Sequence, residues 1–193
     1  MIHPVEAKRR IATGRMSHLS LENSYLIKGQ DYTTNEVVNQ RLQDSSCHSV
    51  ILYPGQNSQN LTTLNNEKRI DLFPEHKKLQ IFVIDGTWAT ARKMIRQSKN
   101  LQPLPRICFT PPAPSNFRVR KQPNSSCFST IEAIHYTIEL VGPGQGFVTG
   151  DRTHDALINV FNFMVENQLD FIRKSNSNLR ETTYRREGQR KIA

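Results

Sequence analysis

Asp85 is the side chain best placed to do chemistry in this sequence. It directly follows the apolar run 79–84 and comes just before an expected helix that begins near Trp88. A carboxylate at such a point either caps the helix or meets a proton or positive charge on a ligand. Gly86 lets a ligand approach the backbone closely, and Thr87 offers another cap. Trp88, the only tryptophan, fits either the core or a stacking surface for a base or adenine.

A second candidate site lies where a basic loop meets an expected helix start. Ser129 and Thr130 precede that helix, and Glu132 stands three residues after Ser129, the spacing of a capping box. The unpaired amide groups at a helix start can hold an anion such as a carboxylate. An exposed loop with an ordinary cap is the alternative. The basic residues of this loop are Arg118, Arg120 and Lys121.

Metal and nucleotide motifs are not recognisable in the sequence. The six histidines show no metal-ligand spacing, although His154 and Asp155 lie close to Asp151. No glycine-rich dinucleotide fingerprint, phosphate-binding loop or nucleophile elbow is found. The three cysteines are widely separated, which is typical of reduced thiols in a cytosolic protein. We therefore predict no metal site and a cytoplasmic location.

Strands and helices are expected to alternate along the chain. Strands are predicted at 49–53, 79–84 and 106–109, and helices at 34–43, 64–70, 88–99, after Ser129, and at 154–169. The polar stretch 56–63 is predicted to be a loop, and Thr13-Gly14 a turn. This alternation is typical of an α/β domain with a mainly parallel sheet flanked by helices. Ligands of such sheets bind beyond the carboxyl ends of the strands, where three strand ends should converge.

Apolar spacing predicts which side of each long helix faces the core. One side of the helix at 88–99 carries Trp88, Ala91, Met94 and Ile95, and the other side carries Arg92, Lys93, Arg96 and Lys99. The last helix is predicted to turn Leu157, Val160, Phe161 and Met164 inward.

The charge of the chain favours an anionic partner. The 193 residues, one domain in length, contain 26 Lys and Arg against 17 Asp and Glu, a net charge of +9. Residues 173–193 hold seven of these cations and two acidic residues. We expect this basic tail to stay flexible or to fold on a partner such as RNA, with a solubilising role as the alternative. No apolar run is long enough to span a membrane, and no secretory leader is evident.

Four sequence blocks, taken in order, resemble the DTW-domain family across residues 3–170. The defining block is Asp85-Gly86-Thr87-Trp88, continued by Ala91-Arg92-Lys93-Met94. The other blocks are His3-Pro4 with Glu6, Arg9-Arg10 and Thr13-Gly14-Arg15, then Leu52-Tyr53-Pro54-Gly55, then Arg118–Lys121 followed by Ser129-Thr130-Ile131-Glu132-Ala133.

The resemblance implies a specific activity. Family members look like tRNA-uridine aminocarboxypropyltransferases with a SPOUT-like fold and a C-terminal trefoil knot. They transfer the 3-amino-3-carboxypropyl group of S-adenosylmethionine to a ring nitrogen of uridine and release methylthioadenosine. The resemblance and the charge distribution together divide the chain into a DTW domain at 1–172 and the basic tail at 173–193.

The resemblance assigns roles to individual residues. Asp85 is the expected catalytic residue, either as a base for the uridine N–H or as an orienting and electrostatic group. The expected cofactor-binding residues are Leu52, Tyr53, Pro54, Gly55, Asp85, Gly86, Thr87, Trp88, Phe109, Ser129 and Thr130. The expected contacts to tRNA phosphates are Arg9, Arg10, Arg15, Arg118, Arg120 and Lys121.

Two other functions are compatible with the same blocks. A SPOUT-type RNA methyltransferase would share the fold and the cofactor, and would release S-adenosylhomocysteine. A non-catalytic RNA-binding module would need only the basic surface. Many family members also carry a Cys-rich segment before the His-Pro block. These 193 residues contain none, so the resemblance gives no support to a zinc-assisted tRNA contact.

Overall fold

A parallel sheet of four strands forms the centre of the computed structural model, which describes residues 1–120 and 127–174. The strands are β1 (Cys47–Leu52), β2 (Ser58–Asn60), β3 (Lys78–Val83) and β4 (Arg106–Cys108), in the order β2-β4-β1-β3. β1 pairs with β3 from Cys47↔Lys78 to Leu52↔Val83. The predicted α/β class and parallel sheet are confirmed.

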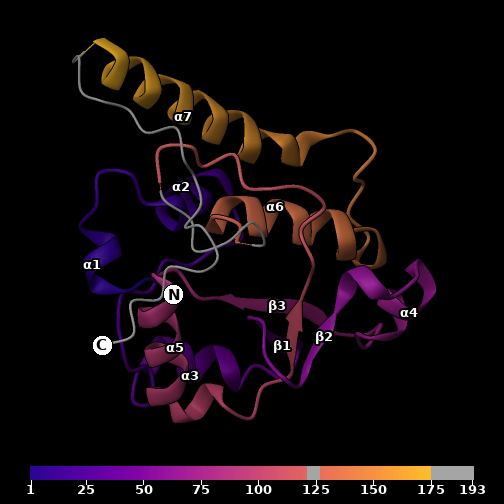
Figure 1. Cartoon of the computed structure of the whole chain (residues 1–193). Helices are drawn as coiled ribbons and strands as arrows, with labels where there is room; N and C mark the ends of the chain where they lie inside the picture. The colour runs from indigo at the N-terminus through magenta and orange to yellow at the C-terminus, as the bar shows by residue number, and fades with distance from the viewer. Residues whose placement is uncertain (121–126, 175–193) are drawn as a thin grey trace.

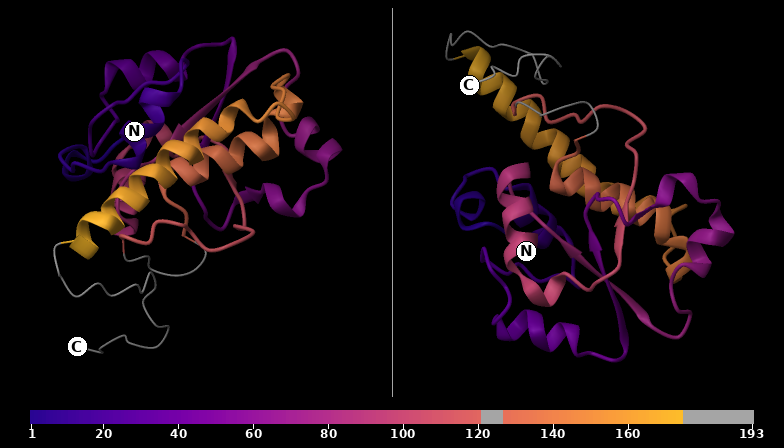
Figure 2. Two further views of the ribbon diagram at one scale, coloured as in Figure 1. Left: turned by 90° about the horizontal axis from the view of Figure 1, so that it is seen from above. Right: turned by 60° about the horizontal axis from the view of Figure 1, so that its bottom comes forward.

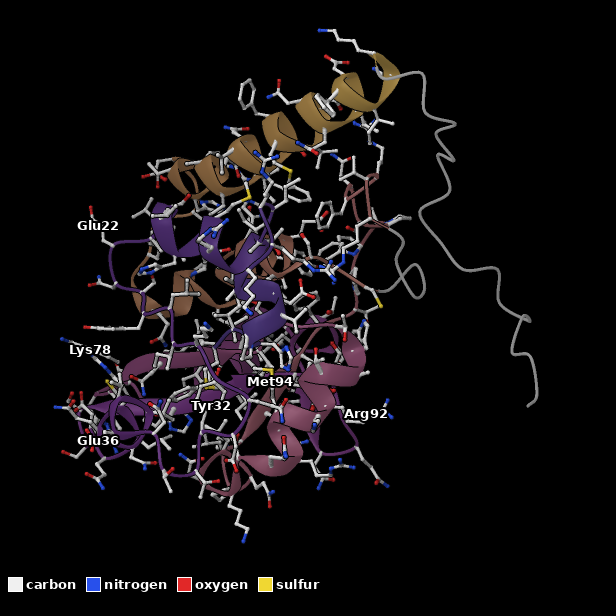
Figure 3. All side chains as sticks on the ribbon, turned by 90° about the vertical axis from the view of Figure 1, so that its left-hand side faces the viewer. Glu22, Tyr32, Glu36, Lys78, Arg92 and Met94 are labelled. Carbon is white, nitrogen blue, oxygen red and sulfur yellow. The ribbon has the colours of Figure 1, made fainter. Side chains whose placement is uncertain are left out.

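Helices cover both faces of the sheet. Successive residues of β1 point to opposite sides, so this strand contributes side chains to a core on each face. Ile51 packs in one core with Met94 of α5 (Trp88–Gln97) and Val38 of α3 (Glu36–Leu42). Figure 1 shows α3 and α5 together on one side of the sheet. In Figure 3, Met94 and Tyr32 lie toward the interior of this layer.

The opposite face of the sheet carries α6 (Thr130–Val141) and α4 (Asn66–Asp71) (Figure 1). Val50 and Leu52 of β1 pack there with Val141 of α6. α1 (Pro4–Ala7) and α2 (Thr13–Ser20) follow the N-terminus, and α7 (Ala156–Lys174) closes the described part of the chain. α2 and α7 both contact α6 (Figure 2). A third core between these helices includes Phe117, Ile131 and Phe161.

Most predicted elements lie within a few residues of their observed bounds, and three predictions are wrong. The stretch 56–63 contains the edge strand β2, which pairs with β4 although its sequence is polar. Thr13-Gly14 is no turn: it begins α2, a helix with no side-chain cap. Val160 is 40% exposed, and Val165 and Leu169 fill the buried side of α7 instead.

The tail prediction falls almost entirely outside the described residues. Arg173 and Lys174 belong to the last turn of α7, and 175–193 are not described. Among the described helices, none combines the length and apolar character that crossing a bilayer requires.

Candidate active site

A cavity of about 310 Å³ lies at the carboxyl ends of β1, β3 and β4, where the alternation of strands and helices predicted a ligand site. Its walls come from these strand ends, from the start of α5 and from the start of α6. The lining residues are Leu52, Tyr53, Pro54, Val83, Ile84, Gly86, Trp88, Ala91, Cys108, Phe109, Cys127, Phe128, Thr130 and Ala133. The cavity has the size and the largely apolar character of a small-molecule site.

Seven of the eleven predicted cofactor residues line this cavity. They are Leu52, Tyr53, Pro54, Gly86, Trp88, Phe109 and Thr130. The other four, Gly55, Asp85, Thr87 and Ser129, lie outside its lining. Thr87 is the N-cap of α5, where its Oγ1 accepts from the Thr90 amide at 3.2 Å. Ser129 is the N-cap of α6.

Seven lining residues were not predicted: Val83, Ile84, Ala91, Cys108, Cys127, Phe128 and Ala133. Helical spacing could have found two of them, because Ala91 and Ala133 each stand three residues after a predicted lining residue. Val83, Ile84 and Cys108 belong to the predicted strand ends. Cys127 and Phe128 follow residues 121–126, which lie outside the described residues, and the sequence around them carries no positional signal.

Asp85 sits behind the cavity wall, at 5% exposure. Its Oδ1 accepts a hydrogen bond from the Thr130 hydroxyl at 2.6 Å, so it contacts a lining residue of α6. Its Oδ2 is buried and has no hydrogen-bond partner among the described residues. The interpretation of Asp85 as a helix cap is wrong, since Thr87 caps α5. A buried carboxylate oxygen without a partner is costly, which is typical of a functional group that meets its partner in a complex.

Gly14 shapes the other side of the Asp85 carboxylate. A Cβ added at Gly14 would lie 2.4 Å from Oδ2 of Asp85 and 2.9 Å from its Cγ. The backbone of Asp85 also bonds to the N-terminal segment: the amide of His3 donates to its carbonyl at 2.9 Å. Residues of the first sequence block therefore contact both the side chain and the backbone of Asp85, just after the end of β3.

Aromatic side chains make up two walls of the cavity. Trp88 is 40% exposed, and its ring centroid lies 6.0 Å from that of Tyr53. The ring centroid of Phe109 lies 5.8 Å from that of Phe128 and 5.0 Å from that of Tyr136. The core interpretation of Trp88 is therefore wrong, and the stacking interpretation fits its place. Burial raises the pKa of the Cys108 thiol, so this lining side chain is protonated at neutral pH and acts as an apolar wall.

The carboxylate of Glu132 occupies the start of α6, where the sequence indicated a candidate site for an external anion. The predicted capping box is present, and the buried Glu132 also reaches the basic loop. Its Oε2 accepts from the Ser129 amide at 2.8 Å and from the Ser115 hydroxyl at 2.6 Å, and its Oε1 accepts from the Asn116 amide at 2.7 Å. The Ser129 amide is therefore occupied, and the loop is fixed to the helix start that borders the cavity.

The predicted RNA contacts are mostly engaged within the protein. Arg9 and Arg120 both pair with the buried Glu6, at 3.2 Å and 3.6 Å. Arg118 pairs with Glu166 of α7, and Arg15 donates to the backbone carbonyls of Arg9 and Arg10. Arg10 is exposed and makes no ion pair among the described residues, and Lys121 lies outside them.

A separate polar cluster joins α6 to the start of α7. His135 Nε2 lies 2.8 Å from Asp155 Oδ1, and His154 Nε2 lies 2.8 Å from Glu139 Oε1. This cluster was not predicted from the sequence, although His135 and Glu139 are four residues apart and so lie on one face of a helix. The four ligand atoms lie within 4.8 Å of one another. The Arg152 guanidinium bonds to both carboxylates, so an internal cation balances their charge.

This cluster predicts a weak loss of stability in acid. The hydrogen bonds from Arg152, then from His135, lower the pKa of Asp155 from 3.8 to about 2. A carboxyl with a lowered folded-state pKa stabilises the fold above its unfolded pKa and loses this contribution as pH falls through the folded value. Asp155→Asn should therefore lower the melting temperature slightly at pH 6, and the difference should shrink toward pH 2 and vanish below it. Asp170→Asn, on the exposed end of α7, is the matched control and should show no such trend.

Comparisons with known proteins match the part of the chain that contains the four sequence blocks. The family model described as the DTW domain matches residues 1–169. The tRNA-uridine aminocarboxypropyltransferase 2 of Drosophila melanogaster is 29% identical over 134 residues, 67% of this chain and 50% of that protein. The chain spans about half the length of this curated relative. No solved structure matches the chain significantly. Because the family model covers most of the sequence, the protein belongs to the DTW-domain family.

Proposed function

We propose that this protein transfers the 3-amino-3-carboxypropyl group of S-adenosylmethionine to a ring nitrogen of uridine in tRNA. The observation that carries the proposal is the cavity of about 310 Å³ at the strand ends, whose walls include residues of three DTW-family blocks. The name of the Drosophila relative supports the same reaction. The net charge of +9 suits a polyanionic substrate.

The lining of the cavity fits S-adenosylmethionine. Trp88 and Tyr53 offer aromatic surfaces for adenine, and Phe109 extends the apolar wall. The Thr130 hydroxyl and the backbone around Pro54 and Gly86 supply the polar contacts. When bound, the cofactor supplies an activated carbon next to a sulfonium.

The transfer requires one bond to form and one to break. The uridine ring nitrogen attacks the methylene carbon of the methionine chain, and the carbon–sulfur bond electrons go to sulfur, which leaves as neutral methylthioadenosine. The ring N–H proton must depart. The Asp85 carboxylate meets the cavity through the lining residue Thr130, whose hydroxyl donates to its Oδ1. We assign this carboxylate either to accept the proton or to orient the N–H.

The SPOUT-like architecture with a C-terminal trefoil knot is also a proposal. A parallel sheet with a cavity at its strand ends supports it. So does the position of α6, whose first turn borders the same cavity. The mechanism above does not depend on the knot.

Trp88 gives a direct reading of cofactor binding, since it is the only tryptophan in the chain and lines the cavity. S-adenosylmethionine should change the tryptophan emission of the wild-type protein. Trp88→Ala should weaken cofactor affinity about 5- to 150-fold, because base–aromatic stacking contributes about 1–3 kcal/mol. Calorimetric titration measures the affinity of the variant. Equal affinities would remove Trp88 from the cofactor site, and Tyr25→Ala, an exposed aromatic residue outside both described cavities, is the control.

A by-product assay tests the proposed reaction. Protein, S-adenosylmethionine and unmodified tRNA are incubated, and the released nucleoside is identified by mass spectrometry. Methylthioadenosine formed only with tRNA supports aminocarboxypropyl transfer. S-adenosylhomocysteine would show a methyltransferase instead. Binding of tRNA without either product would show a non-catalytic RNA-binding module.

A further inference from the structure

Three arginines meet in a second cavity, of about 300 Å³, beside the candidate active site. They are Arg92, Arg96 and Arg106, and the cavity is completed by Tyr53, Ile95 and Gln102. Tyr53 also lines the first cavity, so the two hollows share one wall.

The fold brings these arginines together from two elements. Arg92 and Arg96 are four residues apart, one turn, on the exposed side of α5, and Arg106 begins β4. Figure 3 shows Arg92 on the outer side of α5, away from Met94. A Cβ added at Gly55 would lie 3.4 Å from Nη1 of Arg106, so the guanidinium reaches the loop that follows β1.

No acidic group of the described residues neutralises this cluster. Arg92, Arg96 and Arg106 form no ion pair within residues 1–120 and 127–174, whereas Arg9, Arg118 and Arg120 do. Residues 86–131 contain no Asp or Glu, so a counter-charge for any arginine of this stretch must come from elsewhere in the chain, as Glu166 does for Arg118 and Glu6 for Arg120. Like charges held close together without a counter-ion repel one another, so the site favours an anion from outside the protein.

The geometry points to a phosphate of the RNA backbone as this anion. Guanidinium groups form paired hydrogen bonds with phosphate oxygens, and three of them surround one hollow. Arg92 and Arg96 are exposed, so a polymer can reach them without opening the protein. We propose that this arginine pocket holds a phosphate next to the target nucleotide, while the base enters the first cavity past Tyr53. The inference rests on the proposed function and names a new contact surface for its RNA substrate.

The test compares variants of the three arginines with variants of two lysines nearby in the sequence, Lys93 in α5 and Lys99 just after its end. Arg92→Gln, Arg96→Gln and Arg106→Gln remove cavity charges, and Lys93→Gln and Lys99→Gln remove exposed charges outside it. Binding of tRNA is measured at several salt concentrations, and S-adenosylmethionine binding is measured by Trp88 emission. Each arginine variant should weaken tRNA binding about fivefold near 0.1 M salt and reduce the slope of log K against log salt by about 0.7–0.9. Arg106→Lys should retain most of the slope because the charge remains.

The other outcomes would contradict the proposal in distinguishable ways. Unchanged slopes in the arginine variants, with wild-type tRNA binding intact, would overturn the pocket and leave the proposed function standing. Equal losses in the lysine variants would show a diffuse basic surface instead. Weaker cofactor binding with unchanged tRNA binding would assign the arginines to the cofactor carboxylate. A wild-type protein that does not bind tRNA would contradict the proposed function itself. Melting curves should show no loss of stability in any arginine variant, since no ion pair is lost.

Discussion

Asp85→Asn is expected to lower kcat/KM for tRNA modification by about 100-fold or more while the protein stays folded. The substitution keeps the size of the side chain and an oxygen that accepts from Thr130, so the buried contact survives. It removes the negative charge and the ability to take a proton. Loss of a general base costs about 10²–10⁴-fold in rate. An orienting role should cost less, because the amide oxygen still accepts a hydrogen bond.

The Asp85 prediction has a matched control and a clear contradiction. Asp71→Asn makes the same chemical change at an exposed position of α4 and should retain full activity. Circular dichroism and melting curves check that both variants fold. A folded Asp85→Asn protein with near-normal turnover would exclude both the base and the orienting role.

Gly14→Ala is expected to inactivate the enzyme although it should favour the local helix. Gly14 lies in α2, where alanine would contribute up to about 1 kcal/mol of helix propensity. The new methyl group would lie 2.4 Å from Oδ2 of Asp85, so the carboxylate would have to turn away from Thr130. Overpacking of this kind costs about 1–3 kcal/mol. Misplacing a reacting group by about 1 Å can cost about 100-fold in rate.

The control for Gly14→Ala is Gly150→Ala, where an added Cβ meets nothing within 4 Å. This variant should keep both activity and melting temperature. The measurement is kcat/KM together with thermal unfolding. An active and more stable Gly14→Ala protein would mean that helix propensity outweighs the contact, and that the position of Asp85 does not matter for the reaction.

Local sequence signals predicted three of the four strands and several of the residues that line the cavity. Apolar runs next to turn residues identified β1, β3 and β4, and parallel pairing then placed Tyr53, Trp88 and Phe109 around one cavity. The capping box at Ser129 and Glu132 was also local, because both partners lie within one helical turn.

Long-range contacts account for what the sequence did not reveal. The close approach of Gly14 to Asp85 joins residues far apart in the chain, so no window of sequence contains it. β2 is polar and is held by pairing with β4 and not by its own propensity. The buried Glu6 engages Arg9 and Arg120, which looked like free cations in the sequence. Charge counting alone therefore could not separate structural arginines from the unpaired ones of the arginine pocket.

Following the transferred atoms tests the central claim most directly. S-adenosylmethionine is supplied in two forms, one labelled in the carboxyl carbon and one in the methyl carbon. With wild-type protein and unmodified tRNA, the carboxyl label should enter tRNA and the methyl label should stay in the released nucleoside. Asp85→Asn should transfer little of either. Entry of the methyl label into tRNA, with the carboxyl label left in solution, would contradict the proposed transfer and show methylation instead.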